Sequence, residues 1–321
     1  MTDAAQSKPE PTDIPARRSR ISEFLQSDFI YMFRRSPVAI GSFSVVAVLV
    51  LAALLAPLIA PHDPFNPATL NLMNGFTAPG TPNAFTGDTF LLGTDDQGRD
   101  VFSTILYGMR ISLFVGFAAV MFAMILGVFL GLVAAYVGGW LETLIMRIAD
   151  IQLTFPSILV AMLIFGVAKG FTPVEYRDQM AIWVLIIAIG LSDWVQFARV
   201  VRGATLVEKN KEYVQAARMI GRTGPAIMLR HILPNVLSPV LVIATISLAL
   251  AIIAEATLSF LGVGAPPTQP SLGTLIRIGQ SFLFSGEWWI LLFPAATLLA
   301  LALSVNLLGD WLRDALNPRL R

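Results

Sequence analysis

Apolar residues along this chain gather into long runs instead of alternating with polar ones. A helix needs a run of about 20 such residues to cross the hydrocarbon core of a bilayer. Six runs approach or exceed this length, and three of them contain no charged residue. The pattern predicts an all-α integral membrane protein with six transmembrane helices, at about 38–60, 108–137, 145–168, 179–198, 235–258 and 288–310.

The distribution of basic residues predicts how these helices are oriented. Seventeen of the 22 lysine and arginine residues lie before the first span, between spans two and three, between spans four and five, or after the sixth. Lys and Arg are enriched in cytoplasmic segments, and an even number of spans places both chain ends on one side. Both termini are therefore predicted to be cytoplasmic. Residues 61–107 then form a periplasmic loop and residues 199–234 a cytoplasmic one.

Residues 1–37 precede the membrane domain, which we place at 38–321. The first 20 residues are rich in Ser, Pro, Asp and Arg and predict a disordered cytoplasmic tail. Apolar residues then recur at helical spacing over 21–35, which predicts a helix lying on the cytoplasmic membrane surface. The alternative is a simple extension of the first span.

The composition agrees with a membrane protein and excludes several functions. Hydrophobic residues make up 55% of the chain and charged residues only 13%, while the net charge of +1 argues against a nucleic-acid-binding protein. There is no cysteine and no G-x-x-x-x-G-K-[ST] phosphate loop. The two histidines, His62 and His231, are predicted on opposite sides of the membrane, so they cannot share a site. These absences exclude phosphate-loop nucleotide hydrolysis, cysteine nucleophiles, histidine-paired triads and HExxH zinc sites.

Three carboxylates in or next to the predicted spans are candidate pathway or gating residues, because such groups are costly in a membrane. Asp193 lies deepest in its span. The alternative to a role in transport is a structural residue near the cytoplasmic end, which pairs with Arg199 or faces a wet bundle interior. Asp150 follows Arg147 by three residues, so the two can pair along one helix face. Glu255 is expected at the outer end of span five, where it can simply mark the interface.

Short local patterns predict two further features. Residues 94–100 are acidic but lack the ligand alternation of a calcium-binding EF-hand. Thr94 and Gln97 instead have the spacing of a capping box, which predicts a helix start. Gly127 and Gly131 are four residues apart in span two and let another helix approach closely, either within this chain or from a partner subunit.

The predicted cytoplasmic loop carries the most informative motif, Glu-Tyr-Val-Gln-Ala-Ala-Arg-Met-Ile-Gly over residues 212–221. It predicts a short helix, a Gly-Pro turn, and a second short helix stopped by Pro234. Ala217 and Gly221 are four residues apart and form a face with little side chain, against which another protein can pack. The alternative is a bare helical hairpin on the inner leaflet.

This stretch resembles the EAA loop of bacterial ABC-importer permeases. In that family the loop forms a coupling helix, which docks in a cleft on a cytoplasmic ATPase. Gln215 stands where Glu is usual, and His231 where Ile is usual. The resemblance assigns ATPase coupling to Glu212, Gln215, Ala216, Ala217, Gly221, Leu233 and Pro234.

Within this family the loop is most similar to the C-type subunits of the dipeptide/oligopeptide branch. Segments 61–64, 92–103 and 255–273 carry the same resemblance. The resemblance implies a type I importer permease in the bacterial inner membrane that translocates peptides without catalysis of its own. It implies membrane lipid around the chain and four kinds of partner: a second permease subunit, two ATPase subunits that bind ATP, a periplasmic solute-binding protein and the peptide. The alternatives are nickel, glutathione or another small solute, an ATP-independent channel or transporter, and a non-transporting or exporter component.

Overall fold

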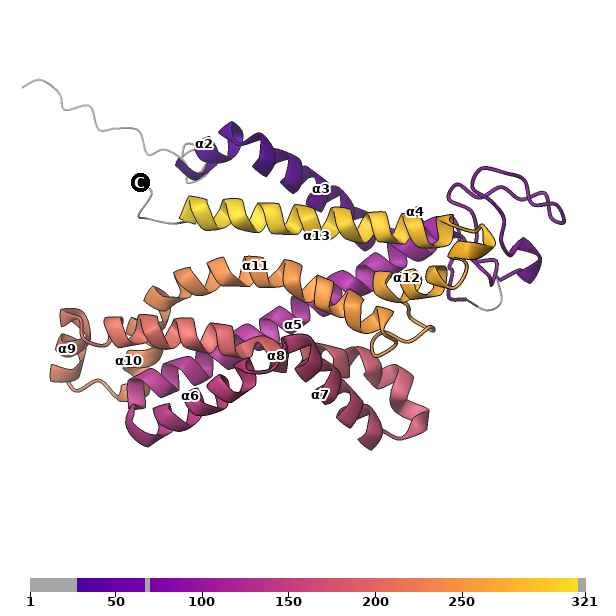
Figure 1. Cartoon of the computed structure of the whole chain (residues 1–321). Helices are drawn as coiled ribbons and strands as arrows, with labels where there is room; N and C mark the ends of the chain where they lie inside the picture. Colours follow the sequence, from indigo (N-terminus) through magenta and orange to yellow (C-terminus); the bar gives the residue numbers. More distant parts are fainter. Residues whose placement is uncertain (1–27, 67–69, 317–321) are drawn as a thin grey trace, which may run out of the picture.

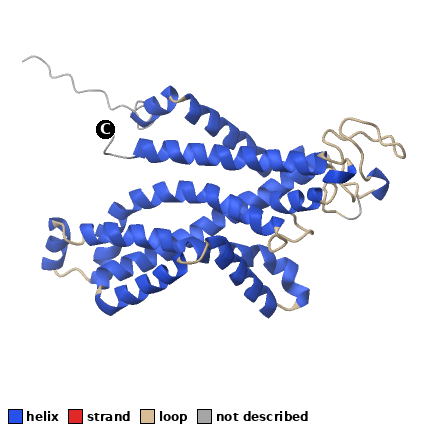
Figure 2. Cartoon of the chain, viewed as in Figure 1, coloured by secondary structure: helices blue, strands red, loops and turns tan. Residues whose placement is uncertain are grey.

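The computed structural model describes residues 28–66 and 70–316. Within these ranges the chain is helical and contains no strand, only two isolated bridges in the loop before residue 101 (Figure 2). The long helices are α3 (Pro37–Leu54), α5 (Val101–Val137), α8 (Arg177–Glu208), α11 (Leu233–Phe260) and α13 (Trp289–Leu316). The shorter ones are α2 (Asp28–Arg35), α4 (Ala56–Ile59), α6 (Gly139–Leu153), α7 (Ser157–Phe171), α9 (Glu212–Met219), α10 (Gly224–Ile227) and α12 (Leu272–Gln280).

The helices form an elongated bundle with two different ends. Helices α3 and α13 lie side by side on one flank, α6 and α7 lie on the other, and α5, α8 and α11 run between them (Figure 1). The short helices α9 and α10 form a hairpin at one end. Helices α4 and α12, together with the loop before α5, lie at the opposite end, which we call the α12 end.

Five helices in the described part are long and apolar enough to cross a membrane, and the remaining predicted span is broken. Helices α6 and α7 meet at an angle of 100°, so the chain has six spans only if this pair counts as one. Pro156 causes the break, because proline lacks an N–H and disfavours helical geometry in the residue before it. The span predicted over 145–168 is thus a bent pair of helices instead of one continuous helix.

Helix α2 is separate from the first span. Ser36 between them is extended (φ −100°, ψ 103°), and its Oγ accepts a hydrogen bond from the Ala39 N–H as the N-cap of α3. The break argues against a simple helical extension of the span. Residues 1–27, which contain the predicted tail and the start of the predicted surface helix, lie outside the described residues, and the surface position of the helix stays a prediction.

The capping box expected at Thr94 and Gln97 is wrong. Helix α5 begins at Val101, and its N-cap is Asp100, whose carboxylate accepts the Ser103 N–H at 2.9 Å. The Thr94 hydroxyl instead accepts the Thr77 N–H at 2.8 Å, so it fixes a loop. The spacing rule failed here because tertiary contacts engage the threonine before it can cap a helix.

The small residues of span two make contacts within this chain. A Cβ atom placed on Gly127 lies 2.5 Å from both the Phe197 Cβ and the Trp194 carbonyl oxygen, and one on Gly131 lies 2.6 Å from the Ala198 carbonyl oxygen. These neighbours all belong to α8. The glycines therefore let α5 and α8 approach backbone to backbone at the centre of the bundle, which decides between the two alternatives left by the sequence.

Glu255 joins three helices near the α12 end. Its side chain is fully buried, which argues against the alternative that it simply marks the membrane interface. The carboxylate accepts hydrogen bonds from the hydroxyls of Ser112 in α5 and Ser259 in α11, each at 2.7 Å. Those two hydroxyls in turn accept the backbone N–H groups of Leu272, the first residue of α12, and Ala265. The carboxylate thus fastens the loop after α11 and the start of α12 to the bundle.

Replacing Gly127 by Ala should destabilise the chain, because its Cβ overlaps the backbone of α8. Such overpacking costs about 1–3 kcal/mol. Gly166 in α7 provides a matched control, since a Cβ there has nothing within 4 Å. We expect Gly127→Ala to lower the thermal unfolding midpoint of the purified chain, and Gly166→Ala to leave it unchanged or to raise it, since alanine favours a helix interior. Equal midpoints for the two variants would contradict this packing.

Replacing Glu255 by Gln should also destabilise the chain at nearly constant side-chain volume. The amide group cannot accept from both serine hydroxyls, so either Ser112 or Ser259 loses its acceptor. A buried polar group left unsatisfied costs about 1–3 kcal/mol, which the unfolding midpoint reports. Glu175→Gln at an exposed position of the same end is the control. A midpoint equal to that of this control would show that the carboxylate is not needed.

Candidate functional site

Helix α9 has one face against the bundle and one exposed face. Val214 and Ala217 point inward and join the main apolar cluster, where Ala217 is only 4% exposed. This corrects the expectation that Ala217 forms part of an outward docking face. The residues at helical spacing on the exposed side are Glu212, Gln215, Ala216 and Met219.

The exposed side ends in large apolar residues that the sequence analysis did not single out. Met219 is 89% exposed and Ile220 is 74% exposed. Their position three and four residues after Ala216 was the available signal, because residues at that spacing share a helix face. Two adjacent exposed apolar side chains next to a small one form a surface suited to contact with another protein.

Gly221 ends α9 by its backbone conformation. Its φ is +77°, a left-handed value that glycine adopts without steric cost. The Arg222 N–H bonds to the Ala217 carbonyl and the Gly221 N–H bonds to the Arg218 carbonyl, which is the Schellman arrangement of a helix C-terminus. A Cβ on Gly221 has nothing within 4 Å. The space beside this residue is therefore open to a partner.

Tyr213 connects α9 to the long helices on both sides. Its hydroxyl donates to the Glu208 carboxylate at the end of α8 and accepts from the Asn235 amide in α11 at 3.2 Å. Partial burial and the bond to Glu208 raise the pKa of the Tyr213 phenol to about 12, so it keeps its proton at neutral pH. This tyrosine clamp, Glu208–Tyr213–Asn235, was also not anticipated from the sequence.

Ion pairs and hydrogen bonds fasten the end of α8 to α5 and α6. Arg202 pairs with Glu142 in α6 at 2.6 Å, and the Lys209 ammonium donates to the carbonyl oxygen of Ala135 in α5 at 2.7 Å. Arg199 pairs with Asp150. The pairings of Asp150 with Arg147 and of Asp193 with Arg199, both expected as alternatives, are therefore replaced by a contact between two helices.

The second arm of the hairpin continues directly into α11. Helix α10 is followed by a π-helical turn at Met228–Ile232 and then by α11, so Pro234 does not stop the helix as expected. The Leu233 N–H bonds five residues back, to Met228, and this wider turn makes room for the proline that follows. Leu233 is half-buried and Pro234 is exposed. The hairpin is thus carried by two long helices.

The three candidate pathway carboxylates are not brought together. Asp150 pairs with Arg199, Glu255 is enclosed near the α12 end, and Asp193 lies partly buried near the middle of α8. In the described ranges Asp193 has no ion pair, and no group of acidic or histidine side chains there could hold a metal ion.

Gln152 contacts α8 next to Asp193, just before the break between α6 and α7. Its amide donates to the carbonyl oxygens of Leu191 and Ser192 at 2.7 and 2.9 Å, and it accepts from the Trp194 indole at 2.9 Å. The broken span, Gln152 and Asp193 therefore lie together about halfway along the bundle. Non-helical backbone at such a depth is tolerated where it is buried in protein or lines a water-filled cavity.

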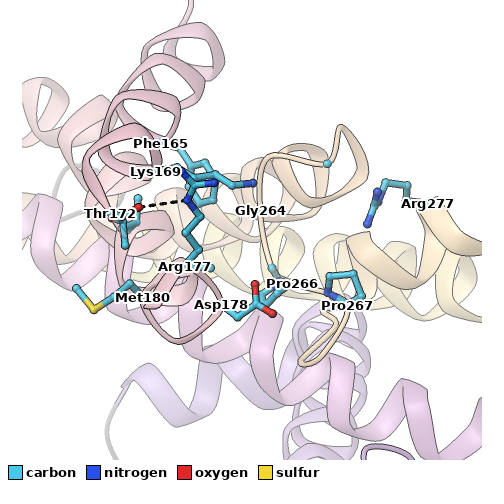
Figure 3. Close-up of a pocket in the computed structure, with 14 residues that line it drawn as sticks. Phe165, Lys169, Thr172, Arg177, Asp178, Met180, Gly264, Pro266, Pro267 and Arg277 are labelled. Carbon is cyan, nitrogen blue, oxygen red and sulfur yellow. Dashed lines mark hydrogen bonds between the residues drawn. The ribbon is translucent and has the colours of Figure 1, made fainter. Parts of the chain in front are cut away.

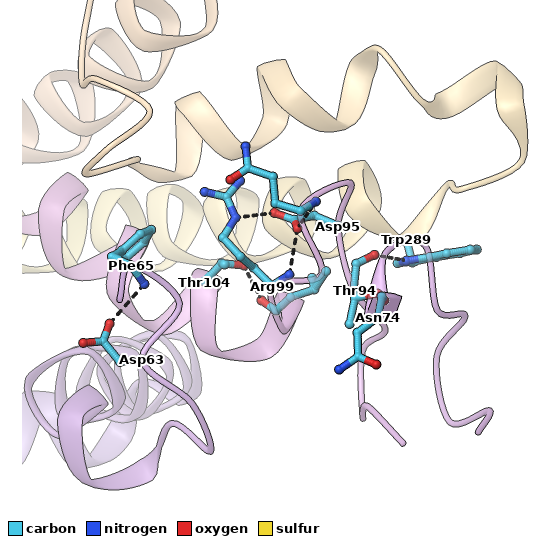
Figure 4. A network of polar contacts seen from close by, with 10 residues as sticks. Asp63, Phe65, Asn74, Thr94, Asp95, Arg99, Thr104 and Trp289 are labelled. Carbon is cyan, nitrogen blue, oxygen red and sulfur yellow. Dashed lines mark hydrogen bonds and ion pairs between the residues drawn. The ribbon is translucent and has the colours of Figure 1, made fainter. Parts of the chain in front are cut away.

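A polar network organises the loop at the α12 end (Figure 4). The buried pair Asp95–Arg99 closes at 2.6 Å, and the Trp289 indole of α13 donates to the Thr94 carbonyl at 3.0 Å. Burial raises the pKa of the Asp95 carboxyl, and the Arg99 guanidinium opposes this shift. The acidic segment is thus a structural crosslink between the loop and α13.

Comparisons with known proteins agree along the chain. Residues 127–321 match the family described as binding-protein-dependent transport system inner membrane component, and residues 25–79 match the N-terminal transmembrane domain of oligopeptide transport permease C. The chain is 36% identical to the dipeptide transport system permease protein of Haemophilus influenzae, covering 92% of this chain and 95% of that one. It is 35% identical to the oligopeptide transport system permease protein of Bacillus subtilis, and the alignment covers 94% of this chain and 92% of that one.

A relative named for another solute and a solved structure complete the comparison. The glutathione transport system permease protein of Pectobacterium atrosepticum is 35% identical, with 96% of each chain covered. A chain of the inward-facing MetNI methionine ABC transporter has the same fold, with a TM-score of 0.52 at 21% identity over 67% of this chain and 96% of that chain. The chain therefore belongs to the family of binding-protein-dependent transport system inner membrane components.

Proposed function

We propose that this chain is a permease subunit of an ATP-driven importer that moves dipeptides or oligopeptides across the bacterial inner membrane. The names of the relatives with 34–39% identity support this substrate class. The observation that carries the transport mechanism is the α9 hairpin: an exposed face with Met219 and Ile220, clamped by Tyr213 to two long helices.

The proposal gives each side of the membrane a partner. The α9 hairpin and both termini face the cytoplasm, where one of two ATPase subunits docks on α9 and binds the ATP, so this chain needs no catalytic residue or cofactor. The α12 end faces the periplasm, where a solute-binding protein delivers the peptide. A second permease subunit completes the translocation path, with lipid around both.

ATP-driven closure of the ATPases would move α9, and the tyrosine clamp would pass this movement to α8 and α11. Helix α8 carries Asp193, which lies beside the broken span α6–α7. We assign this region to the path, because an unpaired carboxylate at mid-depth offers a contact for the ammonium group of a peptide. Glu255 would hold the outer end in place, and Asp150 would hold α6 to α8.

The open space beside Gly221 allows docking to be tested separately from backbone strain. At position 221 the left-handed conformation costs Ala and Trp alike about 1–2 kcal/mol, and a Cβ there has no atom of the described chain within 4 Å. Only the Trp side chain fills the space that the ATPase would use. We expect Gly221→Trp to abolish both co-purification of the ATPase subunits and ATP-dependent peptide uptake in proteoliposomes, and Gly221→Ala to retain most of both.

The two Gly221 variants also define what would contradict the proposal. Similar uptake and co-purification for Ala and Trp would show that Gly221 acts only through its backbone. A Glu→Gln change at Glu142 provides a control, because it removes the ion pair with Arg202 without touching the exposed face of α9. This control should still bind the ATPases.

Replacing Asp193 by Asn should impair transport without disturbing assembly. Loss of one charge-assisted hydrogen bond to a peptide ammonium corresponds to about 1.5–3 kcal/mol, or roughly 10- to 150-fold weaker transport at low peptide concentration. Asp314→Asn is the control, since Asp314 is exposed near the end of α13. Uptake of labelled dipeptide is measured in proteoliposomes containing the complete importer. Unchanged uptake by Asp193→Asn would remove Asp193 from the path.

A further inference from the structure

A small cavity at the α12 end lies where four segments meet (Figure 3). It has a volume of about 100 Å³, and its walls come from the end of α7, the start of α8, the loop after α11 and α12. This size accommodates a phosphate or carboxylate group but not a whole peptide. The cavity is separate from the coupling hairpin and from Asp193.

The charge in this cavity is not balanced by the protein. Lys169, Arg177 and Arg277 line it, against a single carboxylate, Asp178. None of the ion pairs found in the described ranges includes any of these four side chains. Three cations, one each from α7, α8 and α12, therefore line the same cavity. With one carboxylate against them, the formal excess is two positive charges.

The hydrogen bonds of these groups leave room for an anionic ligand. The Arg177 Nε donates to the Thr172 carbonyl at 3.2 Å, which orients the guanidinium, while the Arg277 Nε is buried and has no partner within the described part of the chain. The Asp178 carboxylate accepts a hydrogen bond from the Thr268 hydroxyl at 3.4 Å. Gly262 has a left-handed φ of +80°, and a Cβ placed on it lies 3.6 Å from the Arg277 Nη1, which puts this guanidinium beside the loop that lines the cavity.

Exposed apolar residues that neighbour the cavity-lining Thr172 and Arg177 in sequence, together with Met180, which itself lines the cavity, form what we call the rim. Phe171, the last residue of α7, is 87% exposed, and Val174, Tyr176 and Met180 on the neighbouring turns are also exposed. Aromatic residues at the ends of membrane helices sit at the level of the lipid headgroups. A basic cavity with such a rim places its cations where phospholipid phosphates are concentrated.

We propose that this cavity binds the phosphate of an anionic phospholipid, whose acyl chains lie against the apolar rim. Guanidinium groups bind phosphate oxygens through paired N–H donors, and Arg177 and Arg277 supply them from two sides. The excess of positive charge favours a phosphatidylglycerol headgroup, which has a net negative charge, over zwitterionic phosphatidylcholine. Lipid binding at this site does not depend on what the importer transports, so its test is independent of the test of peptide transport.

The test measures lipid retained by the full chain in nanodiscs of phosphatidylcholine with or without phosphatidylglycerol. After extraction into detergent, native mass spectrometry counts the bound lipids. We expect one retained phosphatidylglycerol per chain, and roughly tenfold weaker retention for Arg177→Gln/Arg277→Gln, corresponding to the loss of charge-assisted contacts. The double variant Arg177→Lys/Arg277→Lys keeps the charges and should retain most of the lipid.

A matched control separates this site from general charge effects. Arg147→Gln/Arg230→Gln removes two exposed cations away from the cavity and should retain lipid like the unmodified chain. Equal loss from this control, or no preference for phosphatidylglycerol over phosphatidylcholine, would overturn the proposal. Displacement of the lipid by an added dipeptide would also overturn it and would assign the cavity to the substrate carboxylate.

Discussion

A buried carboxylate must find hydrogen bonds inside the protein, and much of the α12 end depends on how Glu255 meets this requirement. Its two oxygens accept serine hydroxyls from α5 and α11, and those hydroxyls hold the backbone that leads into α12. Helix α12 packs against α13, and Trp289 of α13 in turn holds the loop before α5. One desolvated side chain thus connects α5 to α11 and α12, which lie more than a hundred residues later in the sequence.

The opposite end of the molecule follows a different rule. The α9 hairpin is fastened by exposed or half-buried polar contacts, including the tyrosine clamp and the ion pairs of α8. Such pairs contribute little stability individually, so the burial of Val214 and Ala217 in the main apolar cluster does most to hold α9 against the bundle. Between the ends, close backbone contact at Gly127 and Gly131 makes α5 and α8 one rigid unit. The molecule therefore has a buried polar network at the α12 end, close helix packing in the middle and exposed polar contacts at the hairpin end.

The sequence predicted the helical membrane class, the approximate spans and the family, because long apolar runs and a contiguous loop motif are local signals. It did not predict contacts between distant residues: Asp150 pairs with Arg199, 49 positions away, in preference to its helix neighbour Arg147. Spacing rules also leave direction undetermined, so Ala217 was placed on the wrong face of α9. Pro156 was a visible signal for the broken span, but the apolar run around it gave no indication of a 100° bend.

The π-helical turn before Pro234 determines where the hairpin points. One additional residue in a helical turn rotates everything beyond it by about 100° around the helix axis, since each residue of an α-helix advances by that angle. The number of residues between Gly224 and Leu233 therefore has to match the direction that the tyrosine clamp and the buried Val214 and Ala217 impose on α9. In a relative with one residue more or fewer in this interval, the exposed face of α9 would point in a different direction relative to α11. The length of the segment therefore matters as much as its composition.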